Sequence, residues 1–248
     1  MGSELPRLDV KRRATAEAVG TALLLATVVG SGIMGERLAG GNVAIALLAN
    51  TLATGAVLVA LILALGPISG AQINPAVTLA VAWEGGLAWS DVPVYLGAQL
   101  LGAFLGVAVG DAMFDLPAFS ISQHVRSGSS QLLSEFVATF GLLSVIWGSS
   151  RLRSSLAVPF AVGAYITAAY WFTASTSFAN PAVALARSVT DTFAGIRPVD
   201  VPGFVIGQLL GAAASTLLFR WMAPVLPAAV PHLALRDRGT PPQRGVGP

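Results

Sequence analysis

The residues best suited to chemistry in this chain are two copies of one tripeptide, Asn74-Pro75-Ala76 and Asn180-Pro181-Ala182. An Asn side chain can cap a helix N-terminus and Pro suits the first helical position, so each copy predicts a helix start. The apolar pieces that follow, near 74–83 and 180–189, are too short to cross a membrane. Because a helix end at membrane depth must be buried in protein or line a wet cavity, the pair indicates two half-helices that meet.

Such a meeting point offers a specific chemistry. The Asn74 and Asn180 amides would direct hydrogen-bond donors at whatever lies between them, and both helix N-termini would add positive partial charge. A site of this kind binds the oxygen of a neutral solute and repels cations, including hydronium. No coupling carboxylate is expected in the path. The pattern therefore favours a passive channel for small neutral solutes, with a coupled secondary transporter as the alternative.

The composition indicates that the bilayer is the solvent of this chain. Of its 248 residues, 54% are hydrophobic and 10% are charged, and the mean hydropathy is +0.74. A soluble domain carries roughly a quarter charged residues. Six apolar stretches are long enough to span a hydrocarbon core of about 30 Å. They lie near 14–35, 43–66, 92–114, 131–149, 156–174 and 201–222.

The chain also repeats itself. Glu17 precedes the first Asn-Pro-Ala motif and Gln99 follows it, and Glu135 and Gln208 flank the second motif in the same order. Three spans in each half are an odd number, so the two halves must have opposite orientations. The prediction is an all-α membrane protein of six transmembrane helices and two re-entrant half-helices. Its channel domain is 14–222, with repeat one at about 14–114 and repeat two at about 131–222.

The placement of Lys and Arg predicts the orientation. Basic residues cluster before the first span, between spans four and five, and after span six: Lys11, Arg12, Arg13, Arg151, Arg153, Arg220, Arg236, Arg238 and Arg244. The positive-inside rule then places both the 1–13 segment and the 223–248 tail in the cytoplasm. The tail is rich in Pro, Gly and Arg and is expected to be disordered.

These motifs resemble those of the major intrinsic proteins, the aquaporin and aquaglyceroporin family. The resemblance covers roughly 14–222 and includes the Glu-x-x-Gly-Thr start at Glu17 and the run Ser69-Gly70-Ala71-Gln72-Ile73-Asn74-Pro75-Ala76-Val77-Thr78. It implies a homotetramer with one pore per subunit. The stretches 175–183 and 191–196 are similar to a bacterial branch associated with arsenic resistance, which implies a bacterial inner membrane.

Family members have a second constriction, which is a ring of four residues at fixed offsets from the two motifs. In this sequence the offsets fall on Thr54, Ala168, Ser177 and Val183. Many water channels have Arg at the last position, where this chain has Val183. All four side chains are small, so the resemblance implies a wide, weakly polar and uncharged ring. Such a ring suits glycerol, urea and the trihydroxides of arsenic and antimony as well as water, and a water-selective aquaporin is the alternative.

Four further polar residues have expected roles. By the resemblance, Glu17 and Glu135 accept hydrogen bonds from the re-entrant loops, whose N–H groups need buried partners. Arg187 has two open interpretations. It is either a vestibule guanidinium that concentrates oxyanions, or a side chain that pairs with loop carbonyls or with Asp191. Asn50, one helical turn from Thr54, is a second candidate for the outer vestibule.

No enzyme, metal or cofactor is expected. The chain has no Cys, and its two His residues, His124 and His232, lie outside the apolar stretches. An intramembrane hydrolase needs a base near its nucleophile, and none is placed for that role. The net charge of +2 and the scattered basic residues give no sign of nucleic-acid binding. The expected partners are water, small neutral solutes and the lipid bilayer, and a non-conducting junction protein is the remaining rival.

Overall fold

The computed structural model describes residues 8–152 and 156–223, and the described residues form helices and connecting loops without strands. Two short 3-10 turns, Arg187–Val189 and Pro198–Asp200, accompany eight α-helices. The helices are α1 (Val10–Leu38), α2 (Val43–Ser69), α3 (Pro75–Trp83), α4 (Val92–Ala112), α5 (Ser129–Leu152), α6 (Ala157–Phe172), α7 (Pro181–Ala186) and α8 (Val201–Met222).

The six predicted spans are all present as helices. Five of them, α1, α2, α4, α5 and α8, are long and apolar enough to cross a membrane by length and composition. The sixth, α6, has 16 residues, which corresponds to about 24 Å at 1.5 Å per residue. Large apolar side chains on the outside, such as Leu101, Leu133 and Ile206, are 60%, 62% and 60% exposed. The chain is therefore an integral, multi-pass membrane protein whose outer surface suits lipid.

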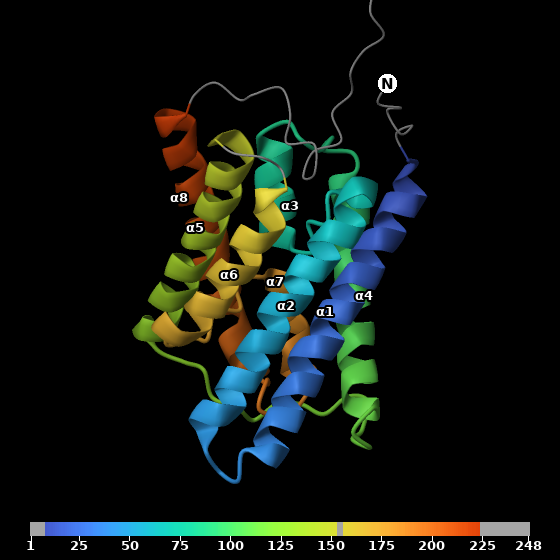
Figure 1. The fold of residues 1–248 in the computed structure, drawn as a ribbon, viewed down its shortest axis with the longest axis vertical. Helices are drawn as coiled ribbons and strands as arrows, with labels where there is room; N and C mark the ends of the chain where they lie inside the picture. The colour runs from blue at the N-terminus through green and yellow to red at the C-terminus, as the bar shows by residue number, and fades with distance from the viewer. Residues whose placement is uncertain (1–7, 153–155, 224–248) are drawn as a thin grey trace, which may run out of the picture.

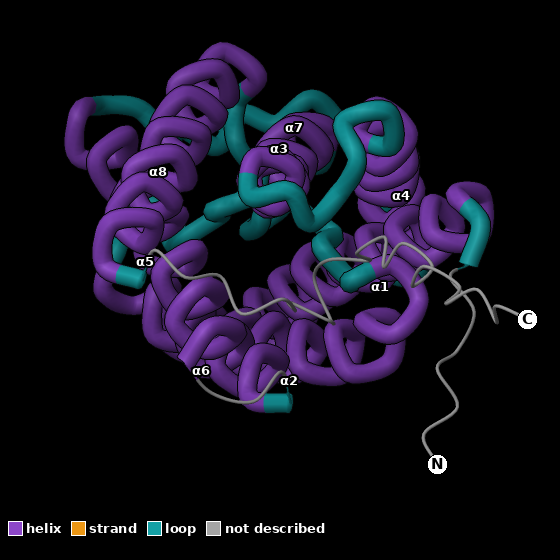
Figure 2. Tube along the Cα trace, turned by 90° about the horizontal axis from the view of Figure 1, so that it is seen from above, coloured by secondary structure: helices purple, strands orange, loops and turns teal. Residues whose placement is uncertain are grey.

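The long helices lie side by side, and the two short helices α3 and α7 lie among them, with α7 below α3 in Figure 1. Seen from above, α3 and α7 lie one behind the other between α8 and α4 (Figure 2). Both short helices contact α4 and α8, and they contact each other. The two half-helices predicted from the Asn-Pro-Ala motifs thus meet inside the bundle.

Helix contacts in the two halves correspond. In the first half α1 packs against α2 and α4, and in the second half α5 packs against α6 and α8. Contact between α2 and α6 joins the halves. This is the inverted repeat of three spans plus three. The boundary of the N-terminal segment differs from the prediction, because α1 already begins at Val10 and the buried Arg13 pairs with Asp91 at 2.8 Å. The predicted tail lies outside the described residues except for Ala223.

Close approach between paired helices depends on glycine. A Cβ added at Gly106 on α4 would lie 2.3 Å from the carbonyl oxygen of Ala22 on α1. A Cβ at Gly211 on α8 would lie 2.3 Å from the carbonyl oxygen of Phe136 on α5. In lipid, where apolar burial drives helix association weakly, such backbone contact supplies much of the attraction. In both halves, therefore, a glycine allows the backbones of two paired helices to come into contact.

We predict that Gly106→Ala destabilises the protein, because the added methyl group must push α1 and α4 apart. Overpacking of this kind costs about 1–3 kcal/mol. The matched control is Gly97→Ala on the same helix, where nothing lies within 4 Å of an added Cβ. Thermal melting in detergent should show a lower midpoint for Gly106→Ala and no loss for Gly97→Ala. Equal midpoints for the two variants would contradict the packing argument.

Candidate functional site

Both Asn-Pro-Ala motifs begin a helix with the same geometry. Asn74 has φ −159° and ψ 118°, and Asn180 has φ −156° and ψ 115°. In each case the Asn Oδ1 accepts a hydrogen bond from the backbone N–H two residues later, at 2.9 Å from Ala76 and 3.0 Å from Ala182. Each Asn is thus the N-cap of its half-helix, and its amide group points away from the helix.

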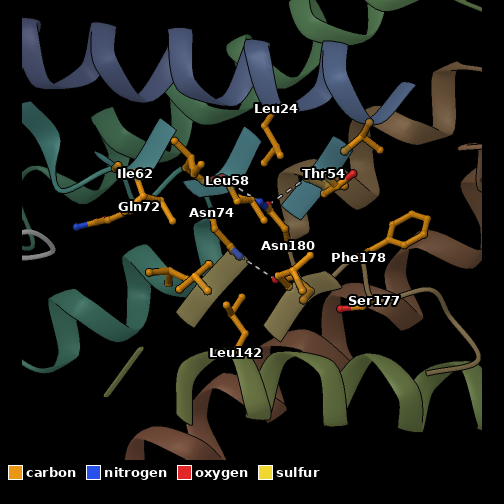
Figure 3. A pocket seen from close by; sticks show the side chains of 18 of the residues that line it. Leu24, Thr54, Leu58, Ile62, Gln72, Asn74, Leu142, Ser177, Phe178 and Asn180 are labelled. Carbon is orange, nitrogen blue, oxygen red and sulfur yellow. Dashed lines mark hydrogen bonds between the residues drawn. The ribbon is translucent and has the colours of Figure 1, made fainter. Parts of the chain in front are cut away.

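The two caps are bonded across the junction. The Asn74 Nδ2 donates to the carbonyl oxygen of Ala179, and the Asn180 Nδ2 donates to that of Ile73, both at 2.8 Å. Figure 3 shows the two side chains at the centre of the cavity with these bonds dashed. An amide nitrogen carries two hydrogens, so one of the two is committed to protein. The expectation of free donors is therefore corrected to one remaining hydrogen on each side chain.

The loops that lead to the half-helices have unusual backbone conformations. Ile73 and Ala179, each directly before its Asn, have φ of 40° and 48°. Ala71 and Ser177, each three residues before its Asn, have φ of 45° and 49°. Positive φ is rare for residues other than glycine and persists only where the surroundings enforce it. The surroundings of both loops must therefore supply strong contacts.

Glu17 supplies these contacts in the first half. Its Oε1 accepts from the Ser69 hydroxyl at 2.6 Å and the Gln72 N–H at 3.0 Å. Its Oε2 accepts from the Ile73 N–H at 2.6 Å and the Gln99 side-chain amide at 2.7 Å. The carboxylate is fully enclosed. One side chain on α1 thus binds the loop, and α4 holds that side chain in place.

Glu135 has the equivalent position in the second half. Its two oxygens accept from the N–H groups of Phe178 and Ala179, both at 2.9 Å. The side chain of Gln208 on α8 donates to Oε2 at 2.6 Å. Glu135 is fully enclosed too, and neither Glu lines the cavity. These are the contacts that a loop-bracing role requires.

One cavity passes both Asn side chains. Its volume is about 60 Å³, and since a water needs about 10–15 Å³ of such space, it holds a short file of small molecules. Apolar side chains line the passage too, with Leu24, Leu58, Ile62 and Leu142 visible around the Asn pair in Figure 3. The residues from α6 are Val158, Val162, Ile166 and Tyr170.

Three of the four predicted ring residues line this cavity, namely Thr54, Ser177 and Val183. The prediction of Ala168 is wrong, because this residue is exposed on the outer face of α6. Tyr170 takes the place, and its hydroxyl donates to the Thr54 hydroxyl at 3.3 Å. Two residues correspond to a rotation of about 200° on a helix. The lining residues of α6 are spaced four apart, from Val158 to Tyr170. This spacing in the sequence could have identified the face of α6 that lines the cavity.

Arg187 lines the same cavity and is 2% exposed. Its Nε donates to the carbonyl oxygen of Ala194, and its guanidinium carbon lies 3.4 Å from the ring centroid of Phe178. Asp191 instead accepts from the Gln123 N–H at 2.9 Å. The expectation of an uncharged ring is therefore corrected, since a side chain one helical turn beyond Val183 is long enough to bring a cation into the passage.

Asn50 does not belong to the vestibule. It is buried between α1 and α2, where its amide donates to the Val28 carbonyl at 2.8 Å and to the Ser31 hydroxyl at 2.9 Å. Both bonds go to α1, and Asn50 is not among the residues that line the cavity. One turn of helix separates Asn50 from Thr54, but the two side chains serve different purposes. Asn50 connects the helices, and Thr54 lines the pore.

Sequence reasoning missed a second buried arginine beside this site. Arg126 lies in the loop before α5, and its guanidinium carbon is 5.0 Å from the ring centroid of Phe178. It donates to the carbonyl oxygens of Gly195, Ser175 and Phe193 at 2.8, 3.3 and 3.4 Å. Burial lowers the pKa of Arg126 to about 10, so it stays protonated at neutral pH. An isolated Arg between two spans carries no sequence signal for such a role.

We predict that Glu17→Leu destabilises the protein more than Glu17→Gln. Gln retains one acceptor oxygen for the loop N–H groups, whereas Leu leaves them unpaired at about 1–3 kcal/mol for each group. Melting in detergent should rank wild type above Gln and Gln above Leu. Glu36, exposed at the other end of α1, provides the control, since its Gln and Leu variants should melt alike. Glu17 variants that also melt alike would exclude the bracing role.

Comparison with known proteins identifies the family of this pore. Residues 4–173 match the family model described as "Major intrinsic protein". Aquaglyceroporin AqpS from Rhizobium meliloti is 56% identical over 218 residues, which is 88% of this chain and 93% of that protein. Aquaporin NIP6-1 from Arabidopsis thaliana is 30% identical, with 86% and 70% covered. The X-ray structure of the aquaglyceroporin from Plasmodium falciparum has the same fold, with a TM-score of 0.68, 22% identity and coverage of 88% and 99%. The chain therefore belongs to the major intrinsic protein family.

Proposed function

We propose that this chain is a passive transmembrane channel for small neutral solutes such as glycerol, urea and metalloid trihydroxides, with water also permeant. The observation that carries the proposal is the single cavity that passes both Asn side chains. Similarity to AqpS, named an aquaglyceroporin, and to the glycerol uptake facilitator of Bacillus subtilis, 34% identical over 121 residues, supports the solute class.

The walls of the cavity suit a solute with hydroxyl groups on one side and carbon on the other. At the junction, Asn74 and Asn180 each offer one amide hydrogen to a hydroxyl oxygen. The rest of the lining offers Leu24, Leu58 and other apolar side chains to the carbon skeleton. Because the two half-helix N-termini direct positive partial charge at the same point, a cation is disfavoured there.

The surroundings of the buried carboxylates favour a channel over a coupled transporter. Glu17 and Glu135 are enclosed and bound to the loops. Among the described residues that line the cavity, none is Asp or Glu. A proton-coupled carrier needs a titrating group in the solute path, as in the relays of pumps. The proposed flux therefore depends on the solute gradient alone.

Family resemblance and surface chemistry also support a mode of assembly. We infer a homotetramer with one pore per subunit, in a bacterial inner membrane with both termini in the cytoplasm. Exposed apolar side chains cover the outside of the bundle, so lipid and neighbouring subunits are both suited to it. The basic residues at the ends of spans support the orientation.

The channel proposal predicts a solute flux that does not depend on ion gradients. Proteoliposomes should equilibrate glycerol, urea and arsenite faster than empty liposomes in stopped-flow light scattering. The same rates are expected with and without an imposed pH gradient or membrane potential, since no titrating group lies in the path. A rate that follows the pH gradient would favour the coupled transporter. Water permeability without glycerol, urea or arsenite permeability would favour the water-selective alternative.

Val183 is proposed to set the size limit, so Val183→Arg should lower the ratio of arsenite to water permeability several-fold. The added side chain would fill the space beside Thr54 and Ser177, and a compact trihydroxide needs more of that space than water does. The matched control is Val183→Leu, which adds bulk without charge and separates a steric effect from an electrostatic one. An unchanged or higher ratio in both variants would move the size limit to the Asn74–Asn180 junction.

A further inference from the structure

The cavity contains a cation at a position where the sequence offsets indicate none. Val183 occupies the family position directly after the second Asn-Pro-Ala motif, yet Arg187 lines the same cavity from four residues later. The half-helix α7 ends at Ala186, and Arg187 begins the 3-10 turn that follows. A residue four positions along a helix lies one turn away on the same face. Arg187 is therefore directed to the passage that Val183 leaves open.

Two contacts hold the guanidinium of Arg187 in place. One face lies on the ring of Phe178, with 3.4 Å between the guanidinium carbon and the ring centroid. The Nε donates to the carbonyl oxygen of Ala194. Stacking on an aromatic face is favourable for a guanidinium and more so when water is excluded. Because Phe178 is itself held by the Glu135 carboxylate through its N–H, the cation is fixed to the braced loop.

The remaining donors of Arg187 are available to a solute. Within the described part of the chain, no hydrogen bond joins its Nη atoms to protein, and these atoms are not fully enclosed either. Arg126, near the same ring, differs in this respect, because its Nε and both Nη atoms donate to backbone carbonyls. Arg126 does not line the cavity. Of these two arginines, only Arg187 can offer donors to the passage.

Among the described residues, no carboxylate contacts this charge. The ion pairs of the described residues involve Arg12, Arg13, Arg151, Arg197 and Arg220, and Arg187 has no such pair. Arg126 adds a second buried positive charge nearby and likewise has no ion pair among the described side chains. A guanidinium does not lose its proton in proteins. This part of the passage therefore carries a positive charge that no described carboxylate contacts.

We infer that Arg187 is the specificity-determining cation of this pore and replaces, from one helical turn further along, the guanidinium that is missing at Val183. It repels protons and other cations, and its Nη donors bind the hydroxyl oxygens of entering solutes. Thr54, Ser177 and Val183 stay small beside it, so the passage combines room for a solute with a fixed charge. This inference rests on the proposed channel function.

The test uses Arg187→Met, which retains length and removes charge, together with Arg187→Lys, which retains charge. Proton flux is measured with a pH-sensitive dye inside proteoliposomes, and water and glycerol permeability by light scattering. We expect at least a tenfold rise in proton flux relative to water permeability for Met, and a ratio near wild type for Lys. The control is Arg37→Met, since exposed Arg37 also lies on a Phe ring and bonds a carbonyl, but not in the cavity.

A rescue variant separates a local effect from damage to the fold. Val183→Arg combined with Arg187→Met returns a guanidinium to the passage from the neighbouring turn, and it should lower the proton leak again. If Arg187→Met does not yield folded protein, Arg187→Gln, which retains hydrogen-bond donors without charge, takes its place and should leak in the same way. Folded, water-conducting Met or Gln variants that exclude protons as well as wild type would overturn the inference.

The two proposals fail in different ways. If wild-type proteoliposomes conduct neither glycerol nor urea, the channel function fails, whatever Arg187 does. If wild type conducts these solutes and excludes protons, while the neutral variants of Arg187 have the same proton-to-water ratio, only the role of Arg187 fails. A leak in Arg37→Met equal to that of Arg187→Met would also overturn it, because loss of any outer arginine would then suffice.

Discussion

The hydrogen bonds between two buried glutamates and the backbone of the re-entrant loops support everything else in this molecule. Lipid offers no partner to an N–H group, so a chain that leaves helical geometry at membrane depth needs an acceptor supplied by protein. Glu17 and Glu135 supply two oxygens each, and Gln99 and Gln208 orient them. Without these acceptors, nothing would offset the free-energy cost of the left-handed conformations at Ile73 and Ala179.

The braced loops in turn connect the two halves of the protein. Each Asn caps its own half-helix with one side-chain atom and binds the opposite loop with another. The junction is thus a closed set of bonds in which each repeat completes the site of the other. A displacement of one loop would move the carbonyl that the opposite Asn needs. Solute recognition at the centre is therefore a property of the pair of repeats.

The constriction around Arg187 follows a different logic, since it combines side chains of different kinds from the two halves. Thr54 lies on α2, Tyr170 on α6, and Phe178 and Arg187 lie on either side of α7. Their contacts with one another are side chain to side chain, namely the hydroxyl bond between Tyr170 and Thr54 and the stacking of Arg187 on Phe178. A small change of side-chain length at this constriction can therefore change the width of the pore, while the loops held by Glu17 and Glu135 stay the same.

Sequence alone determined that the protein lies in a lipid bilayer, where its spans are, and that it has two half-helices in an inverted arrangement. Those features depend on composition, helix capping and the parity of spans, which are local or countable properties. It also indicated Thr54, Ser177 and Val183 as lining residues. It misplaced Ala168, because an offset counted along the chain from a loop cannot give the rotation of α6. It left Arg187 open and missed Arg126, because the reach of a long side chain depends on what lies beside it. Only the tertiary structure places Phe178 and the Ala194 carbonyl where they direct that guanidinium into the passage.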